Sequence, residues 1–251
     1  MKKTVQLVIV LISCVLMPAI FSQPALSQLP SNQQQSFGLF LSLNNNKHTM
    51  DDQSYYFSPY SYGGDGSGTG LSGGFFIQFN LSGSLDMNVK IGYFNISGKL
   101  NNYEKTSIVY QGSTVNAEID HISNLDLSMI ALEPLIIFNF FDRFNAIFGI
   151  SIGFISNKDV RSYEELVYPA DITFENGSRI RNDYSGKLTN TNSSFTFLTF
   201  GLVYDINITQ SFIISPEIIY TKGLSPIIKY NDYKVDLIRF GISVKFPGNY
   251  F

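Results

Sequence analysis

The chain has 251 residues, a net charge of −3, 44% hydrophobic residues and only 15% charged residues. Soluble domains carry about 25% charged residues, yet no stretch beyond the N-terminal region is apolar over the ~18 residues of a helical membrane span. The absence of a basic excess argues against nucleic acid as a partner. A chain of this length can hold one large all-β domain or two smaller ones.

The N-terminus has the features of a secretory targeting segment. Lys2 and Lys3 precede an apolar run over residues 5–21, and Ala25 and Ser27 fit the small-residue pattern of a cleavage site. The sequence therefore predicts a signal peptide over residues 1–27.

Cys14, the single cysteine of the chain, lies within this segment. The letters LISC that end at Cys14 resemble a bacterial lipobox, which would make this cysteine a lipidated N-terminus. The apolar run continues over residues 15–17 instead of becoming a polar tether, which favours removal of Cys14 with the signal peptide. A mature chain without cysteine would have no disulfide.

Eight later segments alternate large apolar residues with small or polar ones. This period of two is typical of a β-strand whose two faces meet different environments. In the last segment, for example, apolar residues alternate with Arg239, Gly241, Ser243 and Lys245. Prolines are awkward inside strands, so we expect irregularities at Pro134 and Pro216. The segments are 37–43, 75–81, 85–93, 128–140, 146–154, 197–205, 212–221 and 238–246.

The connections between these segments alternate between short and long. Short turns are expected near residues 82–84, 141–144 and 206–210, and long polar loops near 44–70, 96–123, 157–193 and 223–234. Such alternation is expected of outer-membrane barrels, whereas a soluble sandwich has no reason to sort its loops.

Together these patterns predict an all-β fold, an eight-stranded antiparallel up-and-down transmembrane β-barrel. It would occupy residues 36–251, follow a short tether over 28–35, and lie in the outer membrane of a Gram-negative-type envelope. The alternative is a soluble periplasmic lipid-binding barrel, whose interior would be apolar.

The energetic cost of exposing charge to lipid assigns the faces. A Lys or Arg that faces lipid at mid-bilayer costs roughly 2–4 kcal/mol, so the charged strand residues must point into the lumen. We expect them to form a structural plug of salt bridges, since an eight-stranded barrel is too narrow to favour a gated pore. The predicted lumenal network comprises Asp86, Lys90, Glu133, Glu217, Arg239 and Lys245.

Two segments resemble a known family. ALEPLIIFNFFDRFNAIFGISIGF (131–154) and PEIIYTKGLSPI (216–227) are similar to the central hairpin and the penultimate strand of the PorT-like, OmpA-like outer-membrane β-barrel proteins of Bacteroidetes and their relatives. The proline that directly follows Glu133 departs from the usual spacing. The resemblance implies no catalytic residues, and some relatives serve protein secretion, so a transport or secretion assembly is an alternative role. The terminal Phe251, or Phe246 before it, resembles the aromatic signal read by the barrel-assembly machinery.

Residues able to carry chemistry are few. Both histidines, His48 and His121, fall in predicted long loops, and Asp120 is poorly placed to orient His121 because neighbouring strand residues face opposite ways. We therefore expect no enzyme, the alternative being a hydrolase that depends on His121. The glycine-rich stretch 63–74 contains a G-x-G-x-x-G match outside any strand–helix context and is predicted to be a flexible loop.

No cofactor and no metal site is predicted. Asp51, Asp52 and Asp65 could gather around a calcium ion, but their spacing matches no known calcium loop.

The loop SYYFSPYSYGG (54–64) is the best candidate for binding a partner. Tyrosine gives a large, rigid contact surface with a polar tip, as at recognition surfaces, although the same residues could instead cap the barrel rim. The candidate residues are Tyr55, Tyr56, Tyr60 and Tyr62. The predicted role is structural or surface interaction by a monomer, with outer-membrane lipid, the barrel-assembly machinery and a surface or envelope partner as its contacts.

Overall fold

The computed structural model describes residues 35–50, 64–141, 143–229 and 232–248, which belong to one compact unit that begins at Gln35. The predicted signal peptide and most of the predicted tether lie outside these residues. No helix among the described residues is long and apolar enough to cross a membrane. The eleven strands are β1 (Gln35–Thr49), β2 (Gly66–Ser82), β3 (Leu85–Asn95), β4 (Gly98–Tyr110), β5 (Ser113–Asn139), β6 (Phe144–Tyr168), β7 (Ile180–Lys187), β8 (Phe195–Tyr204), β9 (Ile206–Thr209), β10 (Phe212–Gly223) and β11 (Lys234–Pro247).

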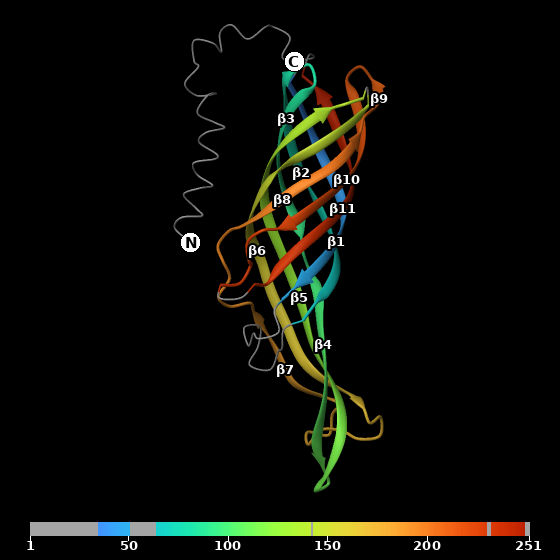
Figure 1. The fold of residues 1–251 in the computed structure, drawn as a ribbon, viewed down its shortest axis with the longest axis vertical. Coiled ribbons are helices and arrows are strands. Elements are labelled where there is room, and N and C mark those ends of the chain that lie inside the picture. The colour runs from blue at the N-terminus through green and yellow to red at the C-terminus, as the bar shows by residue number, and fades with distance from the viewer. Residues whose placement is uncertain (1–34, 51–63, 142, 230–231, 249–251) are drawn as a thin grey trace. The chain divides into compact units, whose positions relative to one another are not determined.

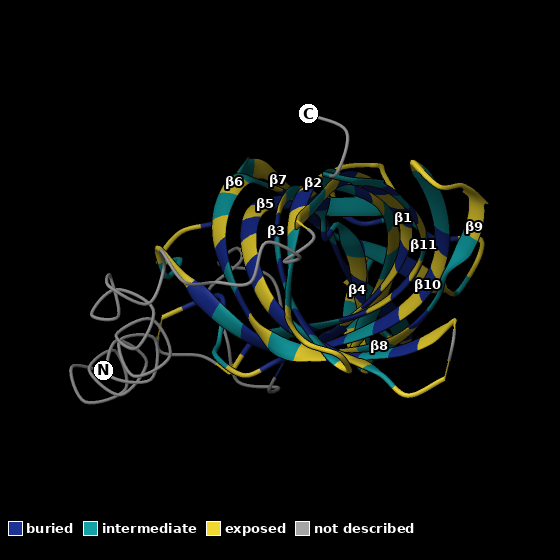
Figure 2. Cartoon of the chain, turned by 90° about the horizontal axis from the view of Figure 1, so that it is seen from above, coloured by how far each residue is buried: buried dark blue, intermediate teal, exposed yellow. Residues whose placement is uncertain are grey.

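Eight of these strands close a ring. Antiparallel pairing runs from β1 through β2, β3, β5, β6, β8, β10 and β11, and β11 pairs with β1 again. The view from above shows the ring as an annulus of strands (Figure 2). Each ring strand covers all or nearly all of one of the eight segments predicted from the sequence, so the all-β antiparallel prediction is confirmed. The predicted count of eight is wrong for the whole sheet, because β4, β7 and β9 were not anticipated.

The short connections all lie at one end of the ring. β2 meets β3 after two residues, β5 and β6 are joined by a short turn, and β9 forms part of the turn between β8 and β10. The ring strands β1 and β11 also begin and end there, since Ser36 pairs with Pro247. The other end, where the long connections lie, is called the long-connection end below.

At the long-connection end, β5 and β6 run far beyond the ring (Figure 1). Their outer parts pair with β4 and β7 to form a four-stranded sheet, called the projection, which comprises β4, residues 113–127, residues 157–168 and β7. The predicted loops over 96–123 and 157–193 are therefore wrong for most of their length. A small cluster of its own stabilises the projection, formed by Ala117, Ile119, Leu166, Ile172 and Phe174.

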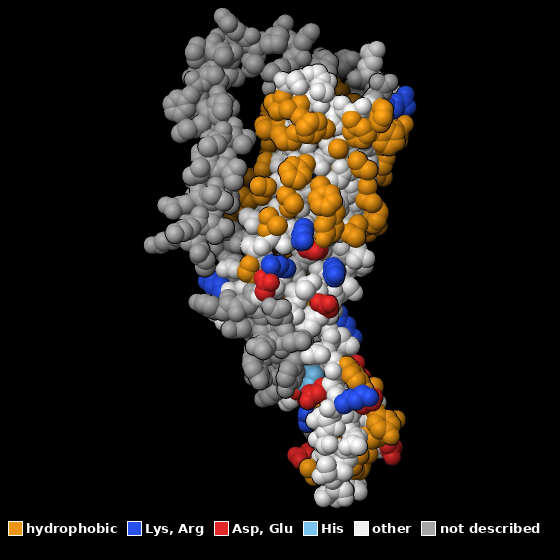
Figure 3. All heavy atoms as spheres, viewed as in Figure 1, with side chains coloured by type: hydrophobic (Ala, Val, Ile, Leu, Met, Phe, Trp, Pro, Cys, Tyr) orange, Lys and Arg blue, Asp and Glu red, His pale blue; other side chains and the backbone are white. Residues whose placement is uncertain are grey.

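The ring strands expose their apolar faces and bury their polar ones. Figure 3 shows hydrophobic side chains gathered over the ring. Large exposed hydrophobic residues occur on every ring strand and form what we call the apolar belt. Its members are Phe37, Leu39, Leu41, Leu43, Leu71, Phe75, Ile77, Ile91, Tyr93, Ile130, Leu132, Phe138, Phe148, Ile150, Phe154, Phe200, Leu202, Ile218, Ile238, Phe240 and Ile242.

The glycine-rich stretch is strand, not the predicted flexible loop, from Gly66 onward. Along β2 a Cβ atom at Gly68 or Gly70 would collide with backbone of the β3–β4 segment. The bare backbone lets side chains of β1 reach across β2: Asn44 Nδ2 donates to Asn95 O (3.1 Å) and Asn46 Nδ2 donates to Ser97 O (2.9 Å). Glycine here allows close backbone approach, a use that composition alone does not distinguish from flexibility.

The prolines lie where one neighbouring ladder is interrupted. The pairing of β5 with β6 skips residues 133–134, although the register on either side is unchanged. On β10, pairing with β9 ends at Ile214 and pairing with β8 begins at Glu217, which leaves Pro216 between them. Each proline thus occupies a position that requires no donor toward that neighbour.

Candidate functional site: the polar lumen

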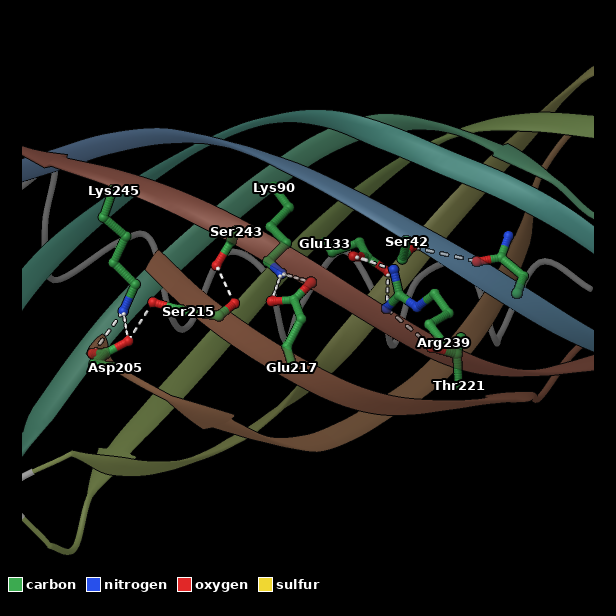
Figure 4. Close-up of polar contacts among 11 residues, drawn as sticks. Ser42, Lys90, Glu133, Asp205, Ser215, Glu217, Thr221, Arg239, Ser243 and Lys245 are labelled. Atoms are coloured by element: carbon green, nitrogen blue, oxygen red, sulfur yellow. Dashed lines mark hydrogen bonds and ion pairs between the residues drawn. The ribbon is translucent and has the colours of Figure 1, made fainter. Parts of the chain in front are cut away.

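All six residues of the predicted lumenal network lie inside the ring, with 1–7% of their surface exposed. The register explains the placement, because residues paired across antiparallel strands share a face. Lys90 of β3 is paired with Glu133 of β5, and Lys245 of β11 with the inward Gly38 of β1. The close-up in Figure 4 shows five of the six, together with polar groups from neighbouring strands.

The most deeply buried ion pair joins Arg239 to Glu133. Arg239 Nη1 donates to Glu133 Oε2 (3.1 Å) and Nη2 donates to Oε1 (2.9 Å), and both side chains are 2% exposed. Arg239 Nη2 also donates to Thr221 Oγ1 (3.1 Å), and Ser151 Oγ donates to Glu133 Oε1 (2.9 Å). A bidentate pair with further hydrogen bonds is the arrangement in which a buried ion pair can offset its desolvation.

A second ion pair lies nearer to the short turns. Lys90 Nζ donates to both carboxylate oxygens of Glu217, at 2.9 and 3.1 Å. The same ammonium lies 5.0 Å from the ring centroid of Phe40 and 6.0 Å from that of Phe76, so cation–π attraction adds to the pair. A Cβ atom at Gly38 would collide with Phe76, and one at Gly92 with Phe40. Glycines on neighbouring strands therefore make room for the two rings inside the lumen.

The third pair includes a residue that the sequence did not single out. Lys245 Nζ donates to both oxygens of Asp205, at 2.7 and 2.9 Å, and Ser215 Oγ donates to Asp205 Oδ1 (2.5 Å). The alternation of the predicted segment places Asp205 on the polar face, one residue beyond the observed end of β8, but Asp205 was not included in the predicted network. The lysine that faces it was predicted to need an anion, which is the signal that could have led to Asp205.

Asp86 differs from the other carboxylates because amide groups surround it. Gln78 Nε2 (2.7 Å), Asn80 Nδ2 (2.8 Å) and Asn139 Nδ2 (3.3 Å) all donate to its oxygens. This carboxylate is held by neutral donors from β2 and β5 near the short turns.

Side chains fill the lumen. A cavity of about 10 Å³ remains beside Lys90, Glu217 and Lys245, about the space of a single water molecule. Toward the long-connection end, a large buried cluster continues from ring residues such as Phe94 and Phe197 to Ile227 and Ile228 of the β10–β11 connection. These buried side chains, from the ion pairs to the cluster at the long-connection end, are called the plug below.

His48 lies in this plug and not in a loop as predicted. It belongs to β1, where its side chain is fully buried, and its Nδ1 accepts a hydrogen bond from Tyr233 Oη (2.6 Å). Its Nε2 lies 3.3 Å from Ser97 O, and the imidazole ring is stacked on the ring of Tyr233. A carbonyl oxygen can only accept, so the proton of the neutral ring lies on Nε2. β1 continues past its apolar segment through the three asparagines at 44–46. The apolar pattern ends before them, so it could not predict this extension.

Burial makes His48 a source of pH-dependent stability. Desolvation lowers its pKa from 6.5 to about 4, because the apolar surroundings disfavour the imidazolium. The unfolded chain therefore binds the proton more tightly, and stability is lost as the pH falls from about 6.5 to about 4. The full loss is about 3 kcal/mol.

To check this, the intensity of the folded gel band is followed against urea at pH 7.5 and pH 4.5, for wild type and for His48→Gln, and the unfolding midpoints are compared. Glutamine can keep both hydrogen bonds without titrating, so its midpoint should fall less than that of wild type. Equal shifts in the two proteins would show that the loss comes from carboxylates instead.

His121 also lies in a strand, contrary to the prediction of a solvated loop. In the projection its Nε2 lies 2.8 Å from Glu104 Oε2 and its Nδ1 3.7 Å from Glu164 Oε1, while Arg181 Nε donates to Glu164 Oε2 (2.6 Å). β4 and β6 flank β5 here, which buries the ring. Asp120 pairs with Tyr103 on the opposite face, as expected from strand geometry. Each ring nitrogen thus faces a carboxylate, as in a structural charge cluster.

Several predicted residues lie outside the described residues, namely Cys14, Asp51, Asp52, Tyr55, Tyr56, Tyr60, Tyr62 and Phe251. Phe246 is described, and its ring stacks on Phe37 with centroids 5.5 Å apart. Within the described part of the chain, no group of three or more His, Cys, Asp or Glu could hold a metal ion.

Comparisons with known proteins give no family assignment but show similar folds. No protein-family model matches the chain, and no curated protein sequence matches it. Similar solved structures include the attachment invasion locus protein Ail of Yersinia pestis (10% identity, 84% of this chain and 98% of Ail, TM-score 0.36). Another is Neisserial surface protein A, with 13% identity over 84% of this chain and 97% of that protein, and a TM-score of 0.37. A third is the outer membrane protein OprG of Pseudomonas aeruginosa, with 10% identity over 85% of this chain and 96% of OprG, and a TM-score of 0.33.

Of these three, OprG is named as an outer membrane protein. The resemblance to the PorT-like family stays a prediction.

Proposed function

We propose that this chain is an eight-stranded transmembrane β-barrel of the outer membrane with a structural or surface-interaction role. The observation that carries the proposal is the inverted distribution of polarity in the ring. Its outer surface is a continuous apolar belt, whereas three ion pairs lie inside. Water would solvate the charges and not the belt, so this arrangement is stable only with lipid outside. A soluble lipid-binding barrel would need the opposite distribution.

The filled lumen supports a role other than passage of solutes or catalysis. The buried charges pair with one another, and a cavity beside Lys90, Glu217 and Lys245 has room for about one water molecule. The projection instead offers surface for contact, since Tyr103, Val109, Tyr168 and Tyr184 are exposed on it. Tyrosine-rich surfaces favour recognition. The barrel is then an anchor that carries the projection, and contact with a surface or envelope partner is its role.

Fractionation followed by a heat-modifiability gel tests the location and the fold together. The full-length chain, expressed in a Gram-negative host, should appear in the outer-membrane pellet. Its unboiled sample should migrate differently from its boiled sample, because the closed barrel resists detergent until heated. Recovery in the soluble periplasmic fraction, without a mobility shift, would overturn the proposal.

A further inference from the structure

A row of outward-facing side chains crosses the molecule just beyond the apolar belt, at the long-connection end. The register fixes it: Lys47 of β1 is paired with Asp236 of β11 on one side and with Ser67 of β2 on the other. Ser67 is paired with Lys99 of β4. Lys222 of β10 lies on the other side of Asp236, since Thr221 is paired with Leu237 and Gly223 N donates to Asp236 Oδ1.

We call Lys222, Asp236, Lys47, Ser67 and Lys99 the rim row. Its three lysines are all exposed, on three strands of the described structure. Asp236 is its one acid, and that carboxylate already accepts hydrogen bonds from Tyr220 Oη (2.8 Å) and Gly223 N (2.9 Å). The row therefore carries a net positive charge on the outer surface.

The rim row lies at the height where lipid headgroups begin. On β1 and β10 the exposed belt residues Leu43 and Ile218 are four positions from Lys47 and Lys222. Four residues of a tilted strand rise about 10 Å, and a lysine stem can reach back toward an interface while its charge stays hydrated. Figure 3 shows Lys and Arg side chains, with Asp and Glu side chains among them, directly beyond the hydrophobic region.

The opposite rim differs in charge. Near the short turns, the one exposed cation among the described ring residues is Arg143, since Lys245 points into the lumen and pairs with Asp205. The two rims of the ring therefore differ in exposed positive charge.

Outer-membrane barrels have short turns on the periplasmic side and longer loops on the outer side, so the long-connection end and the rim row would lie at the outer leaflet. We propose that the rim row binds the phosphate groups of an anionic glycolipid of the lipid A type in that leaflet. The inference rests on the proposed function, because it needs the belt in a membrane. The negative phosphates would be attracted to the positive charges of Lys47, Lys99 and Lys222. The rim row continues into the apolar belt, so the acyl chains of a lipid can lie along the belt, which free phosphate cannot do. Each lysine near an anionic surface strengthens binding several-fold.

Native mass spectrometry of the detergent-solubilised full chain tests the proposal. Diphosphoryl lipid A is titrated into wild type and into the triple variant Lys47→Gln, Lys99→Gln, Lys222→Gln. We expect the triple variant to bind at least about tenfold more weakly. Replacement of the same three lysines by arginine should retain binding. Arg143→Gln, which removes a cation from the opposite rim, is the matched control and should bind as wild type does.

The outcomes separate this proposal from the barrel itself. Each variant is first checked for the heat-modifiability shift, so a folded triple variant that binds diphosphoryl lipid A as wild type does would overturn the rim row and leave the barrel standing. Phosphatidylcholine should bind to all variants equally. If inorganic phosphate at the same concentration displaced the lipid A, the commitment to a lipid would be wrong.

Discussion

Replacement of Arg239 by leucine is expected to lower the free energy of unfolding by about 3–5 kcal/mol, because Glu133 is left as a buried charge without its bidentate partner. Only Ser151 Oγ would still donate to that carboxylate among the contacts described above. Two residues that are each 2% exposed cannot recover solvation from bulk water. The loss should therefore exceed the typical effect of a single substitution.

A double-mutant cycle identifies the cause. Arg239→Leu with Glu133→Leu removes both charges, and a buried pair replaced by apolar residues of similar size is often nearly neutral. The double variant should thus be more stable than Arg239→Leu alone, with a coupling of 1 kcal/mol or more. The chain lacks tryptophan, so the folded gel band in lipid vesicles, followed against urea, is the practical measurement.

The same variants test the plug. Conductance in planar bilayers should stay at the wild-type level for Arg239→Leu, because leucine fills part of the space and the apolar cluster beyond it is unchanged. Discrete channel openings in Arg239→Leu, absent from wild type, would show that the ion pair holds a pore shut.

In the stability cycle, a double variant that is as unstable as Arg239→Leu alone would show that the loss of stability comes from packing and not from the buried charge.

The ring could be predicted because two environments impose a strict pattern on its strands. The exposed belt has an apolar residue at every second position, as at Leu39, Leu41 and Leu43, and the buried inner face carries small or paired polar residues between them. The inward direction of Arg239 and Lys245 followed from the cost of a cation in lipid. Their partners could not be predicted, because each pairing joins strands that are distant in the sequence, such as β5 and β11.

The projection was missed because its strands lie beyond the apolar belt. Along β4 polar residues occupy both faces, and the apolar contribution is limited to residues such as Leu100 and Ile108. Without a second apolar environment the period-two signal disappears, and the composition resembles that of a loop. The burial of His48 and His121 was hidden for the same reason, since both lie on strand extensions beyond the belt.

Arginine in place of Leu41 is expected to cost about 2–4 kcal/mol in a membrane and almost nothing in water, which makes this substitution a direct test of what surrounds the ring. Leu41 lies in the middle of the β1 part of the belt, between Leu39 and Leu43, and 63% of its surface is exposed. In a soluble protein a residue this exposed would tolerate arginine, since surface substitutions usually stay within about 0.5 kcal/mol.

Val109 provides the matched control, because its exposure in the projection is also 63%. Val109→Arg should leave the urea midpoint in lipid vesicles unchanged, whereas Leu41→Arg should lower it. The two substitutions introduce the same charge at equal exposure, so a difference between them isolates the lipid. If both variants unfold at the wild-type urea concentration, the belt does not face hydrocarbon and the proposed location in the membrane is wrong.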